Sequence, residues 1–257
     1  MSKKYIVRKR VNKRNVFLLA ILVSFLVIGG IKLLTGKKEE TVTATSSNKK
    51  VSSTVDEDSS KKIEDKKPQK THFTVVVDAS FGGSDGGSKG YNGIIQKNIN
   101  LDLALKIRDI LEKHSDIDVV LTRDKDETVS MESRIKIIND SKADLLVSIM
   151  QNSEGTGNVS GVETYVLPRE EKNSNPTFGY VLQQAMSMYV DTKDRGVLAR
   201  NMNILTNSSV PGAVVNTGFI TNKKEGTSLA SEKYQLRMAE GISQGILSYI
   251  DRYLKEN

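Results

Sequence analysis

The chain has 257 residues, a formal net charge of +7 and no cysteine. Seven basic residues and no acidic residue lie within residues 1–15, and the other 31 basic residues are matched by 31 acidic ones. The basic excess therefore belongs to a short tail, so a nucleic-acid-binding surface on the rest of the chain is not indicated. The lack of cysteine excludes disulfides, thiolate metal sites and a lipid anchor on cysteine.

An apolar segment follows the basic tail directly. Residues 16–34 contain a single charged residue, Lys32, and about 19 residues span roughly 28 Å as a helix, which suits the hydrocarbon core of a bilayer. The preceding basic residues predict a single-pass signal anchor in the cell membrane, with residues 1–15 in the cytoplasm and the C-terminal domain outside. A cleaved signal peptide is the alternative, because residues 42–44 form a weak cleavage-like site.

Residues 35–71 are mostly Lys, Glu, Asp, Ser and Thr. Such a composition buries too little apolar surface to offset the entropy cost of ordering the chain. The segment therefore predicts a disordered polar linker that holds the next domain away from the membrane.

Strand and helix signals alternate from residue 72 to residue 257. Apolar runs rich in β-branched residues predict strands at 73–78, 118–121, 145–149, 161–166 and 211–216. Amphipathic periodicity predicts helices at 98–113, 134–139, 178–189 and 229–254, with Ser130 as the N-cap before the second helix. The alternation is typical of a single α/β domain with a mostly parallel sheet flanked by helices.

In sheets of this kind the functional residues follow the carboxyl ends of the strands. Four segments take that position and read Asp78-Ala-Ser-Phe-Gly-Gly, Ile95-Gln-Lys-Asn, Ser148-Ile-Met-Gln-Asn and Val215-Asn-Thr-Gly-Phe. In their order and spacing these motifs resemble those of the zinc-dependent N-acetylmuramoyl-L-alanine amidases of the cell wall (amidase type 3). The resemblance runs from about residue 73 to residue 253.

That resemblance implies one zinc ion held by two histidines and a glutamate, with a second glutamate as general base for amide hydrolysis. At the matching positions this chain has Phe81, Gln96 and Met150 for the ligands and Asn216 for the general base. Phenylalanine has no lone pair, a thioether is too soft, and a neutral amide neither balances Zn²⁺ nor accepts a proton. We therefore expect a degenerate member without zinc and without a catalytic residue.

Other side chains are not expected to rebuild the site. His72 precedes the first strand, roughly 20 Å from the loop that carries Phe81, and His114 closes a helix, so both are interpreted as surface residues. Asp78 and Glu163 are the carboxylates expected nearest to the replaced positions, which leaves a metal-free acid–base pair open. Asp78 is better interpreted as a residue that orders its own loop.

These features predict a membrane-anchored pseudo-amidase of peptidoglycan metabolism. The expected groove for peptidoglycan or its stem peptide contains Asp78, Phe81, Gln96, Met150, Asn152, Arg195 and Asn216. The same surface could instead bind a protein, such as an active amidase or a component of the division or sporulation machinery. Two alternatives stay open: an active N-acetylmuramoyl-L-alanine amidase with a non-standard site, and a structural spacer whose groove binds nothing.

Overall fold

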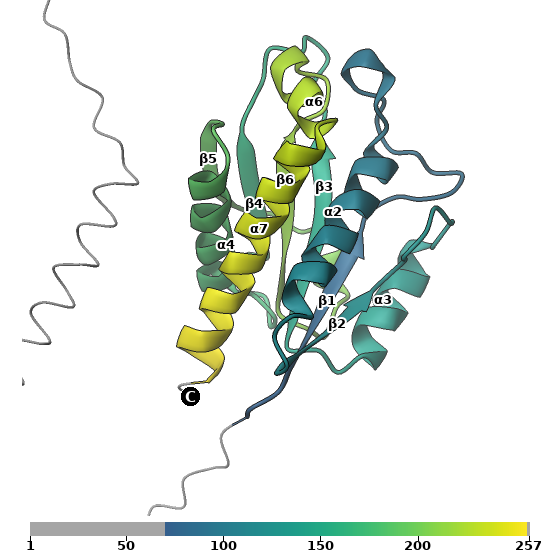
Figure 1. Cartoon of the computed structure of the whole chain (residues 1–257). Coiled ribbons are helices and arrows are strands. Elements are labelled where there is room, and N and C mark those ends of the chain that lie inside the picture. The colour runs from purple at the N-terminus through teal and green to yellow at the C-terminus, as the bar shows by residue number, and fades with distance from the viewer. Residues whose placement is uncertain (1–69, 256–257) are drawn as a thin grey trace, which may run out of the picture. The chain divides into compact units, whose positions relative to one another are not determined.

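The structure is a computed structural model that describes residues 70–255 (Figure 1). The predicted tail (1–15), the predicted anchor (16–34) and nearly all of the predicted linker (35–71) lie outside the described residues. Within residues 70–255, none of the helices combines the length and the apolar character that a membrane span requires.

The described residues form a six-stranded sheet in the order β2-β1-β3-β6-β4-β5. The strands are β1 Phe73–Ala79, β2 Ile117–Leu121, β3 Leu145–Asn152, β4 Val162–Val166, β5 Asp194–Ala199 and β6 Gly212–Phe219. Neighbouring strands run parallel except β4 and β6, which pair antiparallel. The predicted α/β fold with a mostly parallel sheet is confirmed.

Helices cover the two faces of this sheet unequally. The larger core cluster lies under α2 (Gln96–Leu111), α4 (Pro176–Tyr189) and α7 (Glu232–Tyr249), and α2 and α7 lie in front of the sheet in Figure 1. The smaller cluster lies under α3 (Met131–Asp140) and the short α5 (Asn203–Thr206). The remaining helical segments are η1 Tyr91–Gly93, α6 Lys223–Leu229 and η2 Ile250–Leu254.

The alternation of side chains along each strand determines which residues lie on the face of the sheet that α3 and α5 cover. In β1, Val75 belongs to the core under α2, α4 and α7, whereas its neighbour Val76 belongs to the core under α3 and α5. Because successive side chains point to opposite faces, Asp78 shares the face of Val76. The register pairs Asp78 with Ser148 of β3, so polar residues of adjacent strands gather on the α3 side, near the carboxyl ends of the strands.

Several sequence-based boundaries need correction. The strand β5 was not among the predicted strands, because it is an edge strand with exposed ends and Gly196 at its centre, and so it lacks an apolar run. The helix predicted at 229–254 is interrupted, since α6 ends at Leu229 and Ser231 has the extended backbone of an N-cap before α7. The N-cap predicted at Ser130 is confirmed, because its Oγ accepts a hydrogen bond from Ser133 N at 3.1 Å.

Two of the predicted site residues, Met150 and Gln96, sit in different elements from those expected. Met150 lies inside β3, one residue past the end of the strand predicted at 145–149, whereas Asp78 and Asn216 lie in β1 and β6, within the strands predicted at 73–78 and 211–216. Gln96 is the first residue of α2 rather than a loop residue. The strands continue past the predicted ends because pairing with their neighbours extends further than the apolar runs do.

Candidate functional site

Met150, Asn216 and Glu163 lie side by side on the adjacent strands β3, β6 and β4. The register pairs Met150 with Asn216 and Asn216 with Glu163. Paired residues on neighbouring strands stand about 5 Å apart with their side chains on the same face. The sheet therefore brings one predicted ligand position, the predicted general-base position and a carboxylate into one row.

The other two predicted ligand positions, Phe81 and Gln96, meet at Gly87. A Cβ atom placed on Gly87 would lie 2.4 Å from Gln96 Oε1 and 2.8 Å from Phe81 Cδ2, so both side chains pack directly against this glycine. Phe81 has a φ of 65°, which is strained for a non-glycine residue. Its carbonyl oxygen accepts a hydrogen bond of 2.6 Å from Arg134 Nη2, which holds the strained turn in place.

The two amides at replaced positions are engaged by the backbone. Gln96 Oε1 accepts a hydrogen bond from Ser88 N at 2.7 Å, and its Nε2 donates to the carbonyl oxygen of Gln151. Asn216 is fully buried, and its Oδ1 accepts a hydrogen bond from Asn152 N at 2.7 Å. Both side chains therefore take part in holding the loops and the end of β3 in place.

The residues at these positions do not fit a zinc ion. Phe81 offers no donor atom, Met150 offers a thioether, and the oxygen atoms of Gln96 and Asn216 are neutral and already accept backbone hydrogen bonds. His72 is exposed and lies 2.8 Å from Asp118. Within residues 70–255, no group of three or more His, Cys, Asp or Glu side chains is placed to hold a metal.

Glu163 is the centre of a hydrogen-bonded cluster. Its carboxylate accepts hydrogen bonds from Tyr165 Oη, Asn152 Nδ2 and, at 2.6 Å, Arg195 Nε. Burial acts to raise the pKa of Glu163, but the hydrogen bonds from Tyr165 and Arg195 and the charge of Arg195 together lower it below its ordinary value. Glu163 therefore stays ionised, and two of the predicted groove residues, Asn152 and Arg195, serve to hold it.

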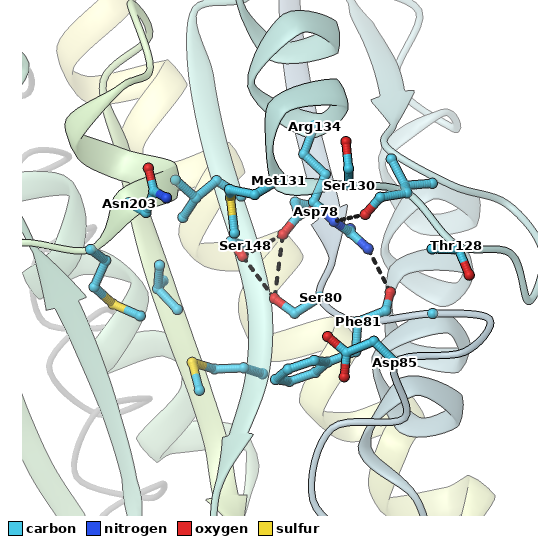
Figure 2. Close-up of a pocket in the computed structure, with 16 residues that line it drawn as sticks. Asp78, Ser80, Phe81, Asp85, Thr128, Ser130, Met131, Arg134, Ser148 and Asn203 are labelled. Carbon is cyan, nitrogen blue, oxygen red and sulfur yellow. Dashed lines mark hydrogen bonds and ion pairs between the residues drawn. The ribbon is translucent and has the colours of Figure 1, made fainter.

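Asp78 is the centre of a second cluster on the same face, shown in Figure 2. It is almost fully buried and accepts hydrogen bonds from Thr122 Oγ1 at 2.7 Å, Ser148 Oγ at 2.6 Å and Arg134 Nη1 at 2.6 Å. The prediction that Asp78 orders its own loop is confirmed, since Ser80 Oγ also donates to it at 3.3 Å.

Two cavities lie at the ends of the row formed by Met150, Asn216 and Glu163, since Met150 lines one and Glu163 lines the other. The first, the α3 cavity, has a volume of about 320 Å³ and is lined by residues that include Asp78, Ser80, Phe81, Met131, Ser148 and Met150. The second, the β5 cavity, has a volume of about 620 Å³ and is lined by residues that include Asn152, Glu163, Tyr165, Arg195, Arg200 and Phe219. The predicted groove residues are thus divided between two spaces, and Gln96 and Asn216 line neither of the two.

Sequence reasoning missed three residues that shape this region. Arg134 supports both Asp78 and Phe81 from α3, and Tyr165 and Arg200 complete the β5 cavity. One sequence signal was available: Tyr165 follows Glu163 by two positions on a strand, so the two share a face. Nothing local marks Arg134 or Arg200, because their roles depend on contacts between distant segments.

A sequence model of the N-acetylmuramoyl-L-alanine amidase family matches residues 75–248. Among curated proteins, the uncharacterized protein YqiI of Bacillus subtilis is 36% identical over 179 residues, which cover 70% of this chain and 85% of that protein. An uncharacterized cell wall amidase of Bacillus anthracis is 30% identical over 190 residues, which cover 69% of this chain but only 35% of that protein.

Solved structures give the same result. An N-acetylmuramoyl-L-alanine amidase from Clostridium difficile 630 superposes with a TM-score of 0.68 and 35% identity, covering 71% of this chain and 99% of that one. The CwlD amidase of Clostridioides difficile, solved in complex with the GerS lipoprotein, superposes with a TM-score of 0.65 and 29% identity, covering 70% of this chain and 99% of that one.

Proposed function

The chain belongs to the N-acetylmuramoyl-L-alanine amidase family, and from this membership we propose that it is a peptidoglycan-binding pseudo-amidase that does not cleave its ligand. The observation that carries the proposal is the state of the replaced positions. Phe81 and Met150 offer no suitable donor for zinc, and the amides of Gln96 and Asn216 are engaged by the backbone. No group at these four positions is free to activate water.

The arrangement of the carboxylates argues against a metal-free hydrolase. Asp78 on β1 and Glu163 on β4 are separated by β3 and β6, which is three interstrand steps of about 4.8 Å. Asp78 accepts hydrogen bonds from Arg134, Thr122 and Ser148, and the pKa of Glu163 is lowered by its donors. Two carboxylates that already accept several hydrogen bonds each, and lie roughly 14 Å apart, are not placed to act as a general acid and a general base on one amide.

The proposal retains a binding role because open space remains beside the replaced positions. The β5 cavity has the size and the mixed polar lining of a ligand site. The proposed location is outside the cell membrane, with residues 16–34 as the anchor, where peptidoglycan is within reach. A protein partner is a second candidate for the same surface, and it is favoured by the complex of the related CwlD amidase with the GerS lipoprotein.

The test is amide cleavage and binding by the purified full-length chain on peptidoglycan sacculi with excess Zn²⁺, beside an active family member. The proposal expects co-sedimentation with sacculi and no released stem peptide. Turnover that survives a chelator would overturn the pseudo-amidase and indicate a metal-free site. Turnover that a chelator abolishes would show that the ligand positions are assigned wrongly. The absence of both turnover and co-sedimentation would favour a structural spacer.

A further inference from the structure

Two arginines from the β5 segment line the β5 cavity, and each is stacked on an aromatic ring. Arg195 Cζ lies 5.1 Å from the centroid of the Phe219 ring, and Arg200 Cζ lies 5.0 Å from the centroid of the Tyr165 ring. A guanidinium group that stacks on a ring keeps its N–H donors available in its own plane. The rings therefore fix where the two groups lie without using those donors.

Most of these donors are unused. Arg195 donates from Nε to Glu163 at 2.6 Å, but in the described part of the chain neither of its Nη atoms makes a hydrogen bond. Arg200 forms no side-chain hydrogen bond and no ion pair with any residue between 70 and 255. Its backbone is held in place, because Arg200 N donates to the carbonyl oxygen of Val166 at 2.8 Å.

Neither acidic side chain of the cavity pairs with Arg200. Glu163 pairs with Arg195. Glu154 accepts hydrogen bonds from Thr156 N at 2.9 Å and Thr156 Oγ1 at 2.6 Å, within its own loop. Arg200 therefore brings a positive charge and five N–H donors to the cavity, without an acceptor from the described chain. Such a space favours a ligand that is rich in oxygen acceptors and carries a negative charge.

We infer that the β5 cavity is a subsite for a carboxylate, with Arg200 as its charge partner and the Nη atoms of Arg195 as donors to a second acceptor on the same ligand. The ligand class is a peptidoglycan stem peptide with free carboxylates, so the inference rests on the proposed function. The two arginines stand five positions apart along the strand direction, which puts their Cα atoms roughly 16 Å apart. Their guanidinium groups stack on two different rings, those of Phe219 and Tyr165, so we assign them to separate acceptors on one ligand.

The test compares two probes on the full-length chain by isothermal titration calorimetry: a synthetic N-acetylmuramoyl tripeptide with free carboxylates, and the same compound with its carboxylates amidated. The wild-type chain is expected to bind the free-carboxylate probe about tenfold more tightly. Arg200→Gln is expected to remove this preference and to leave binding of the amidated probe unchanged. Arg200→Lys, which keeps the charge but loses the planar fork, is expected to retain part of the preference.

Arg237→Gln is the matched control, since Arg237 is an exposed arginine on α7, over the opposite face of the sheet. It should keep the wild-type preference. Equal affinity of the wild-type chain for the two probes, or a preference that survives Arg200→Gln, would overturn the subsite while leaving the proposed function intact. Failure of the wild-type chain to bind either probe would overturn the subsite. The co-sedimentation experiment then decides the proposed function: it stands if the chain binds sacculi and fails if the chain does not.

Discussion

Asn216 Nδ2 lies 3.4 Å from Glu163 Oε1 across the antiparallel pair β6–β4. The residue at the predicted general-base position is thus a hydrogen-bond donor to a neighbouring carboxylate. This contact is one of those that lower the pKa of Glu163. A glutamate at the same place would set one carboxylate against another.

Asn216→Glu should therefore destabilise the fold relative to Asn216→Gln. Glutamine has the same size as glutamate, but its amide can still donate a hydrogen bond to Glu163. We expect the difference at pH 7.5 to be about 1–3 kcal/mol, the usual cost of an uncompensated buried polar group. The difference should shrink as the pH falls and one of the two carboxylates takes up a proton. Thermal unfolding of the two variants at pH 7.5 and pH 4.5 measures it. Equal stability of the two variants at both pH values would show that residue 216 does not affect Glu163.

Arg195→Gln should raise the pKa of Glu163, because it removes a 2.6 Å hydrogen bond and a positive charge. A carboxylate whose pKa is lowered on folding stabilises the protein above its unfolded pKa, and this stabilisation is lost as the pH falls through the folded pKa. The wild-type chain should therefore exceed the variant in stability at pH 7, and the difference should close in acid, as the pH falls through the lowered pKa of Glu163. Denaturation across the pH range tests the sign, and a difference that widens in acid would contradict it.

Arg134→Met should be strongly destabilising. The Arg134–Asp78 pair is 2.6 Å long, and its side chains are 4% and 1% exposed, so the variant leaves a buried charge without its partner, at a cost of about 3–5 kcal/mol. Lys136→Met on the same helix is the control, because Lys136 pairs with Asp140 while 74% exposed and should change stability by less than about 0.5 kcal/mol. Urea unfolding compares the two. Similar effects would show that burial does not control the strength of these pairs.

Zinc affinity should return only when the ligands are restored together. A protein zinc site needs at least three nitrogen, oxygen or thiolate ligands, so Phe81→His, Gln96→Glu or Met150→His alone should bind Zn²⁺ no better than the wild-type chain. The triple variant should bind at least tenfold more tightly, as measured by competition with a chromophoric chelator. Stoichiometric binding by the wild-type chain itself would show that the ligands lie elsewhere.

The fold was predictable wherever apolar pattern and burial agree. The run 145–149 predicted a strand because β3 is buried on both faces, and this strand is confirmed. Strand β5 was not predicted, because it lies at the edge of the sheet and its own sequence lacks an apolar run. Its pairing with β4 holds it in place, and that pairing cannot be read from the local sequence.

The site was predictable as a set of positions and not as a set of contacts. The family resemblance assigned Met150 and Asn216 to one site, and the register of β3 and β6 pairs the two residues. That Gln96 binds backbone atoms of the loop at Ser88 and of β3 could not be predicted, because it requires the loop conformation around Gly87. The roles of these residues in binding stay predictions.

The hydrogen bonds of Gln96 and Asn216 oppose single substitutions toward a metal centre. Gln96→Glu exchanges the amide that donates to the Gln151 carbonyl for an anion that repels it, and Asn216→Glu opposes Glu163. Each of these single substitutions toward the zinc-binding and general-base residues implied by the resemblance is therefore expected to lower stability before any metal chemistry could follow. On the proposed function, several simultaneous substitutions therefore separate this chain from a working metal centre, and neither of these two is neutral for the fold.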